Sequence, residues 1–173
     1  MSGINLSQDF IIDYEGYSDS HDFLIKELSF VSLRDSKGKT YMFRPDQPLE
    51  NFSEKFQRNV QYCTRNVCCI PYYYGDTSYE VLYELKFLLP LMCTRLLSKG
   101  STKCAFLAAF FDMPVLDLAL LGCPSYKDLN TAAKSEQGGH CFFHGEPKKN
   151  FHCSQFKCKL LNDFVYALSK ANN

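Results

Sequence analysis

The sequence predicts a single α/β domain in which a five-stranded mixed sheet, its first three strands antiparallel, is flanked by helices. Short apolar segments at 9–13, 23–33 and 40–44 are separated by turn-forming residues. Segments with apolar residues at helical spacing follow, and they alternate with further apolar runs. This order of elements suits a mixed sheet covered by helices.

Chain length and composition fit one domain with one core. The chain has 173 residues, of which 46% are hydrophobic, and this argues against global disorder. The sequence contains no apolar run of about 18 residues, and the first residues, MSGINLSQDF, lack the features of a secretion signal. An odd number of cysteines, nine, argues against a disulfide framework. We therefore expect an intracellular protein, cytoplasmic or nuclear, that does not associate with a membrane.

The first three segments are expected to form an antiparallel meander. Leu24, Leu28 and Phe30 share one face of the second segment. The turn RDSKGK contains Gly38, which can adopt a positive φ, and TYMFR at 40–44 is the predicted third strand.

Helices and two further strands are expected after this meander. Apolar spacing indicates one helix between 49 and 60 and another between 78 and 100. By composition, CAFLAAF (104–110) is predicted as a buried strand, and the apolar run PVLDLALL follows closely. The last helix is expected from about 154 to 169.

Two acidic residues after the first apolar segment form a candidate catalytic site. Asp13 and Glu15 are two positions apart, so on a strand both side chains point to the same side. Converging carboxylates are unfavourable unless a cation neutralises them, as Mg²⁺ or Mn²⁺ does in many enzymes. The spacing by itself favours the simpler interpretation, a solvated turn after a strand.

The order of elements and these acids resemble the DEDD-type 3′→5′ exonucleases, which have a ribonuclease-H-like fold. Asp13 and Glu15 match the family's D-x-E motif, and Asp112 ends a Phe-Asp pair similar to its second motif, without the family's Asn. The DEDDh branch ends with a His and, five residues later, an Asp. His152 matches that His, but Lys157 occupies the position of the acid. The resemblance thus implies a metal-dependent exonuclease or ribonuclease site of Asp13, Glu15, Asp112 and His152, with the three acids near one another at strand ends and cleavage slow or absent.

Cysteines and a histidine near the C-terminus form a candidate metal site. Cys123, Cys141, His144 and Cys153 have the spacing C-x17-C-x2-H-x8-C. The C-x2-H pair can chelate one tetrahedral ion, and thiolates combined with an imidazole select zinc. Four unrelated loop residues are the simpler alternative. Three other residues are rival ligands: His140, His152 and Cys158.

A structural Zn²⁺ would order the polar segment 127–150 and tie it to the last helix, giving one domain over 1–173 with a zinc-binding segment at about 121–158. An exonuclease-like domain with such a site also resembles the Maelstrom domain. That family is a divergent branch of the DEDDh exonucleases that has lost its acids and gained zinc ligands. The resemblance implies a nucleic-acid-associated role with altered or absent cleavage.

Basic and aromatic residues are candidates for contacts with single-stranded RNA or DNA. Tyr73 lies in a tyrosine-rich loop, and positive charge comes from Lys148, Lys149 and Lys157. Such residues more often form an ordinary solvated face. The chain also lacks the basic excess of a duplex binder, with 19 basic and 19 acidic side chains, so any contact must be local. Two functions stay open: a nuclease-derived domain that acts on or binds single-stranded nucleic acid, and a non-catalytic module that binds a protein partner and has a structural zinc.

Overall fold

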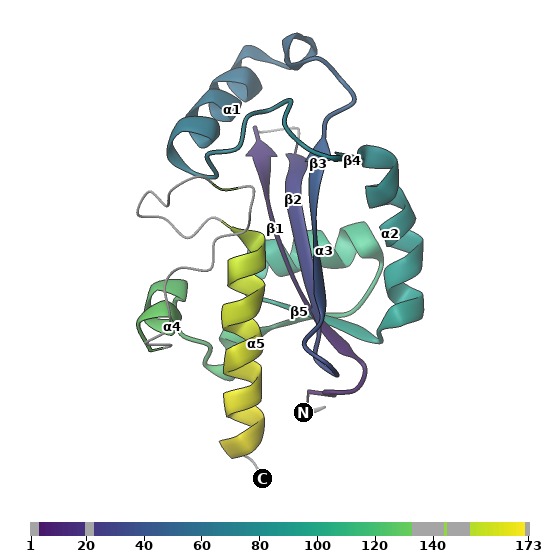
Figure 1. Ribbon diagram of the computed structural model, residues 1–173, viewed down its shortest axis with the longest axis vertical. Coiled ribbons are helices and arrows are strands. Elements are labelled where there is room, and N and C mark those ends of the chain that lie inside the picture. Colours follow the sequence, from purple (N-terminus) through teal and green to yellow (C-terminus); the bar gives the residue numbers. More distant parts are fainter. Residues whose placement is uncertain (1–3, 20–22, 133–143, 145–152, 172–173) are drawn as a thin grey trace.

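A six-stranded mixed sheet forms the centre of the fold in a computed structural model, which describes residues 4–19, 23–132, 144 and 153–171 (Figure 1). The strand order is β4-β3-β2-β1-β5-β6. β1, β2 and β3 are antiparallel neighbours. The other pairings are parallel: β5 with β1, β6 with β5, and the short β4 with β3. The predicted α/β architecture and its antiparallel start are therefore confirmed. The strands are β1 (Asp9–Ser18), β2 (Phe23–Ser32), β3 (Gly38–Arg44), β4 (Thr77–Ser78), β5 (Arg95–Ser98) and β6 (Val115–Asp117).

Helices cover both faces of this sheet. In Figure 1, α5 lies on one side of the sheet, and α2 and α3 lie on the other. Along β1, Phe10 and Ile12 pack toward α2 and α3, whereas Ile11 packs toward α5, as strand alternation requires. The helices are α1 (Glu54–Asn66), α2 (Tyr79–Met92), α3 (Ser101–Phe111), α4 (Tyr126–Ala132) and α5 (Ser154–Ala171), with 3₁₀ turns at Leu49–Asn51 and Leu118–Leu121.

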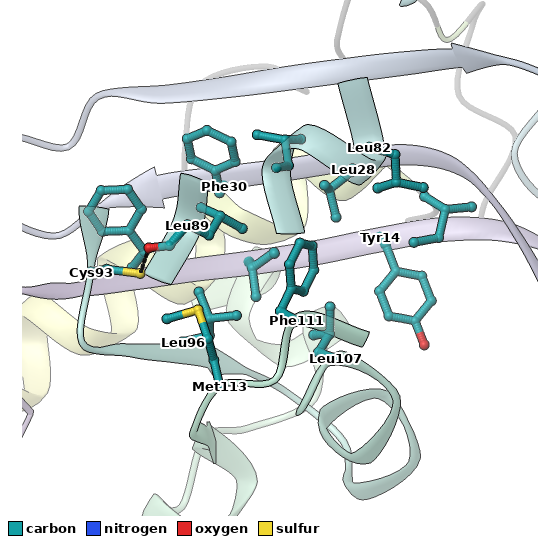
Figure 2. Close-up of a cluster of buried hydrophobic side chains, with 14 of the residues drawn as sticks. Tyr14, Leu28, Phe30, Leu82, Leu89, Cys93, Leu96, Leu107, Phe111 and Met113 are labelled. Atoms are coloured by element: carbon teal, nitrogen blue, oxygen red, sulfur yellow. Dashed lines mark hydrogen bonds between the residues drawn. The ribbon is translucent and has the colours of Figure 1, made fainter. Parts of the chain in front are cut away.

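The largest core lies between the sheet and the α2–α3 pair. Figure 2 shows Leu82 and Leu89 of α2 and Leu107 of α3 directed toward the strands. Leu28 and Leu96 meet them from the sheet, and all five side chains are buried. This core holds the two helices against one face of the sheet, so the opposite face is where α5 brings polar groups to β1 and β2.

The parallel partner of β1 is β5, and the prediction that 104–110 forms this strand is wrong. The pairing joins 9–11 to 95–97. Residues 104–110 belong to α3, which begins after Gly100 in a positive-φ conformation. A short apolar run is compatible with a buried strand and with a buried helix, so composition could not distinguish them. The sheet also has six strands instead of five, because the two-residue β4 adds to β3.

The helices in the described part of the chain were compared with the requirements of a membrane-spanning helix. None of its helices combines the length and the apolar character that crossing a bilayer requires.

Candidate functional site

Asp13 and Glu15 lie on the face of β1 that α5 covers. The Nζ atom of Lys103, on α3, is 2.6 Å from Asp13 Oδ1 and 3.7 Å from Glu15 Oε1. Both carboxylates therefore point to the same side, as the D-x-E spacing predicted. They stand in the middle of β1 instead of at its end, and the register with β2 shifts directly after Glu15, at Gly16.

Two lysines and a tyrosine surround the acidic pair. Lys157, in the first turns of α5, donates a hydrogen bond to Glu15, and the Tyr126 hydroxyl donates to Asp13 Oδ2 at 2.9 Å. Asp13 is fully buried and Lys157 is 7% exposed. The two ammonium groups thus neutralise the carboxylates of Asp13 and Glu15 without a metal ion.

The neighbouring carboxylates of Asp13 and Glu15 keep Lys103 in its protonated, positively charged form. Burial by itself would lower its pKa, but the Asp13 and Glu15 carboxylates outweigh that effect and raise the pKa above the ordinary value. The side chain also donates to the Tyr14 carbonyl at 2.8 Å, beyond the last residue of β1 that pairs with β5. Lys103 is therefore a cation built into the fold beside the edge of β1.

The remaining members of the predicted catalytic set are placed differently. Asp112 is exposed and is the left-handed C-cap of α3, so the prediction that it ends a strand is wrong. The Phe-Asp pair matched the motif, but it stands on a helix and not on a strand. His152 lies outside the described residues.

A second polar group lies next to the acidic pair. Glu27 on β2 is directly opposite Glu15 in the antiparallel register. Its carboxylate is 3.5 Å from His144 Nε2 and 3.7 Å from Cys153 Sγ, and the three possible ligand atoms lie within 4.8 Å of one another. Ligands at about 2.0–2.3 Å from a tetrahedral ion are about 3.3–3.8 Å apart. Glu27, His144 and Cys153 can therefore hold a metal ion.

The environment of Glu27 favours a cationic partner. Burial, followed by the neighbouring Cys153, raises the pKa of this carboxyl group to about 8, whereas His144 acts in the opposite direction. Glu27 is fully buried and Cys153 is 3% exposed. A cation at this point would compensate a carboxylate that otherwise resists ionisation.

The predicted zinc ligands are only partly brought together. His144 and Cys153 belong to this group, Cys141 lies outside the described residues, and Cys123 is not a member. Cys123 packs instead in the apolar cluster beneath α5. Cys158, a rival candidate, is in the same cluster and donates to the Ser29 carbonyl at 3.3 Å. His140 and His152, the other rivals, are outside the described residues.

The structure describes two of the four predicted nucleic-acid contacts, Tyr73 and Lys157. Tyr73 is 54% exposed, and its hydroxyl accepts a hydrogen bond from the Leu49 N–H at 3.0 Å. Lys157 is buried against Glu15, so it does not lie on the solvated face that the sequence suggested. Lys148 and Lys149 lie outside the described residues.

Comparisons with known proteins found no relative, so the sheet topology is the one observation that bears on a family relationship. No protein-family model matches the chain, and no match was found among the curated proteins. The sheet, with three antiparallel strands followed by parallel ones, is consistent with a ribonuclease-H-like fold.

The pairing of Glu15 with Lys157 should be measurable as coupling between the two side chains. Replacing Lys157 by Met should lower the free energy of unfolding by about 2–4 kcal/mol, because a largely buried carboxylate loses its nearest cation. Adding Glu15→Gln should restore more than half of that loss. Urea unfolding measures both, and Lys159→Met, an exposed neighbour on α5, should stay within about 0.5 kcal/mol of the unchanged protein. A Lys157→Met variant as stable as this control would contradict the pairing.

Proposed function

We propose that this chain is a ribonuclease-H-like domain, derived from a nuclease, that binds single-stranded RNA or DNA without cleaving it. The observation that carries the loss of cleavage is the pairing of Asp13 and Glu15 with Lys103 and Lys157. Two-metal hydrolysis needs carboxylates that are free to hold two divalent ions about 4 Å apart. Here the carboxylates are already neutralised, and a divalent ion would have to displace buried ammonium groups. The missing final acid, at the position of Lys157, supports the same conclusion.

The proposed occupant of the second group is a structural zinc ion. A thiolate, an imidazole and a carboxylate are all zinc ligands, and the distances between them suit a tetrahedral ion. Cys141, predicted from its C-x2-H spacing to His144, is the proposed fourth ligand. Four protein ligands leave no open position for catalysis. The ion would connect β2 to the start of α5, and the domain's stability would depend on it.

Binding of single-stranded nucleic acid can be tested with fluorescently labelled RNA and DNA oligonucleotides. We expect binding without shortening of the oligonucleotide in Mg²⁺ or Mn²⁺. Tyr73→Ala should weaken binding at least fivefold, because a base that stacks on an aromatic ring gains about 1–3 kcal/mol. Tyr62→Ala is the matched control, since Tyr62 is a similarly exposed tyrosine on α1. Equal affinities of the two variants, or no binding at all, would contradict this proposal.

An exposed apolar row on α2 favours a second candidate, a protein-interaction module. Tyr83, Phe87 and Leu91 follow one another at intervals of four residues and are 57%, 73% and 83% exposed. Contiguous exposed apolar side chains of this kind mark interaction surfaces. A chain that binds neither RNA nor DNA, with its zinc intact, would favour this function over the first.

A further inference from the structure

A cavity of about 570 Å³ lies between α5 and the β2–β3 part of the sheet. α5 packs mainly on β1 and β2 and reaches β3 only slightly, so part of β3 is left uncovered on this face. The walls of the cavity come from β2, from the turn after it, from β3 and from α5. Small-molecule sites are typically clefts of about 300–1,000 Å³, so this cavity has the size of a ligand site.

Asn162, on the wall of this cavity, has a buried amide group whose hydrogen bonds are incomplete. Its side chain is 8% exposed, and Oδ1 has no hydrogen-bond partner among the described residues. Nδ2 donates to Ser36 Oγ at 3.4 Å, which uses one of its two N–H groups. A buried polar atom without a partner costs about 1–3 kcal/mol. Because the terminal torsion of an amide is soft, the group can turn to a ligand in the cavity.

The other polar groups in the buried part of the lining are already paired. The Ser29 hydroxyl shares one hydrogen bond with Thr40 Oγ1, at 2.8 Å, and another with Ser154 Oγ, at 2.6 Å. Val31 and Phe156 add apolar surface to the walls. Among the buried residues of the lining, Asn162 is therefore the one with polar atoms that still need a partner.

Charge is balanced on the α5 side of the cavity. Lys159 and Asp163 both line it, and their spacing of four residues places them on one face of α5. Lys39 also contributes to the lining, but its ammonium group lies 4.5 Å from the centre of the Tyr41 ring, which packs on the opposite face of the sheet. An uncharged ligand therefore suits the cavity better than an anion or a cation.

We propose that this cavity binds adenosine and that Asn162 recognises the edge of the adenine base. A side-chain amide presents an acceptor and a donor side by side, and adenine presents the complementary N6 amino group and N7 atom. Oδ1 would accept from the N6 amino group, and the second N–H of Nδ2 would donate to N7. Adenine is also flat and uncharged, which matches the apolar walls and the charge balance. Asp163 would accept a hydrogen bond from a ribose hydroxyl group.

Adenosine could reach the cavity as a free nucleoside or as one residue of a single strand. The chemistry that Asn162 recognises is the same for both sources. The second source alone rests on the proposed nucleic-acid function.

The test compares the affinities of the full chain for adenosine and inosine by isothermal titration calorimetry. Inosine has an oxygen in place of the N6 amino group, so it would leave Oδ1 unpaired. We expect adenosine to bind at least about tenfold more tightly, the effect of losing one hydrogen bond. Asn162→Leu, a change to a side chain of similar shape, should remove this preference. The control Asn66→Leu, at an exposed asparagine of α1, should keep it.

Nuclear magnetic resonance of the unchanged protein supplies a readout that does not depend on how well the leucine variant folds. Adenosine should shift the side-chain amide resonances of Asn162 and leave those of Asn66 in place. Equal affinities for adenosine and inosine, an unchanged preference in Asn162→Leu, or unmoved Asn162 resonances would overturn the proposal.

An adenosine oligonucleotide separates the two sources and the two proposals. Tighter binding of the oligonucleotide than of adenosine, abolished by Asn162→Leu, would support a base within a strand. Binding of adenosine by a chain that binds no oligonucleotide would support the free nucleoside and contradict only the proposed nucleic-acid function. Binding of oligonucleotides without any binding of adenosine, and unaffected by Asn162→Leu, would overturn this inference and leave that function standing.

Discussion

Replacing Cys153 by Ser is expected to remove the proposed zinc ion and to lower the free energy of unfolding by more than about 3 kcal/mol. The thiol lies 3.7 Å from the Glu27 carboxylate, in a region where both groups are almost fully buried. Losing the ion would leave the buried carboxylate without its cation and would release the start of α5 from β2. Elemental analysis of protein purified without a chelator, followed by urea unfolding, measures both effects.

Two further variants identify the ligand set. Glu27→Gln should also lose zinc, because an amide is a much poorer zinc ligand than a carboxylate. Cys123→Ser is the matched control: this thiol is also buried but lies in an apolar cluster, so about one zinc per chain should remain. Zinc retained in Glu27→Gln and lost in Cys123→Ser would show that the four residues first predicted from the sequence are the ligands.

Replacing Lys26 by Met is expected to destabilise the fold by at least about 3 kcal/mol, because three carbonyl groups, two of them in buried hydrogen bonds, would lose their donor. The fully buried ammonium group donates to the carbonyls of Phe43 and Tyr72, each at 2.8 Å, and to that of Tyr74. These bonds fasten the loop before α2 to the end of β3. Burial lowers the pKa of Lys26 to about 8, so the ammonium form, which alone has three N–H donors, persists at neutral pH.

The matched control for Lys26→Met is Lys55→Met, since Lys55 is exposed on α1. It should change the free energy of unfolding by less than about 0.5 kcal/mol. Hydrogen exchange should accelerate in 72–76 for Lys26→Met and not for Lys55→Met. Equal stability of the two variants would mean that water can serve the three carbonyls in place of Lys26.

Much of the fold follows from local sequence patterns. Apolar alternation and the turn RDSKGK correctly located the antiparallel meander, and helical spacing correctly located α5. The error at 104–110 arose because β5 has only four residues, RLLS, which continue the apolar spacing of α2 without a break. The apolar segment that followed was then assigned as the missing strand. Tertiary pairing with β1, and not local preference, decides between these two segments.

The candidate site was less accessible to sequence reasoning. The convergence of Asp13 and Glu15 depends on strand alternation alone and was predictable, whereas Lys103 reaches them only because α3 packs beside β1. Glu27 was not predicted as a site residue because its partners, His144 and Cys153, lie more than 100 residues further along the chain. Its signal was nevertheless present: the segment FLIKELSF contains two adjacent charged residues, Lys26 and Glu27, in a strand with no other charged residue. Charges buried in this way need specific partners.

The central claim is that one sheet face carries two adjacent centres: an acidic pair neutralised by lysines, and a metal site at Glu27, His144 and Cys153. Anomalous scattering from crystals grown with zinc and with an excess of Mn²⁺ tests it most directly. We expect one zinc peak between Glu27, His144 and Cys153, and no manganese peak at Asp13 and Glu15. A manganese ion bound between Asp13 and Glu15, with Lys103 or Lys157 displaced, would contradict the claim and restore a metal-dependent nuclease as the function.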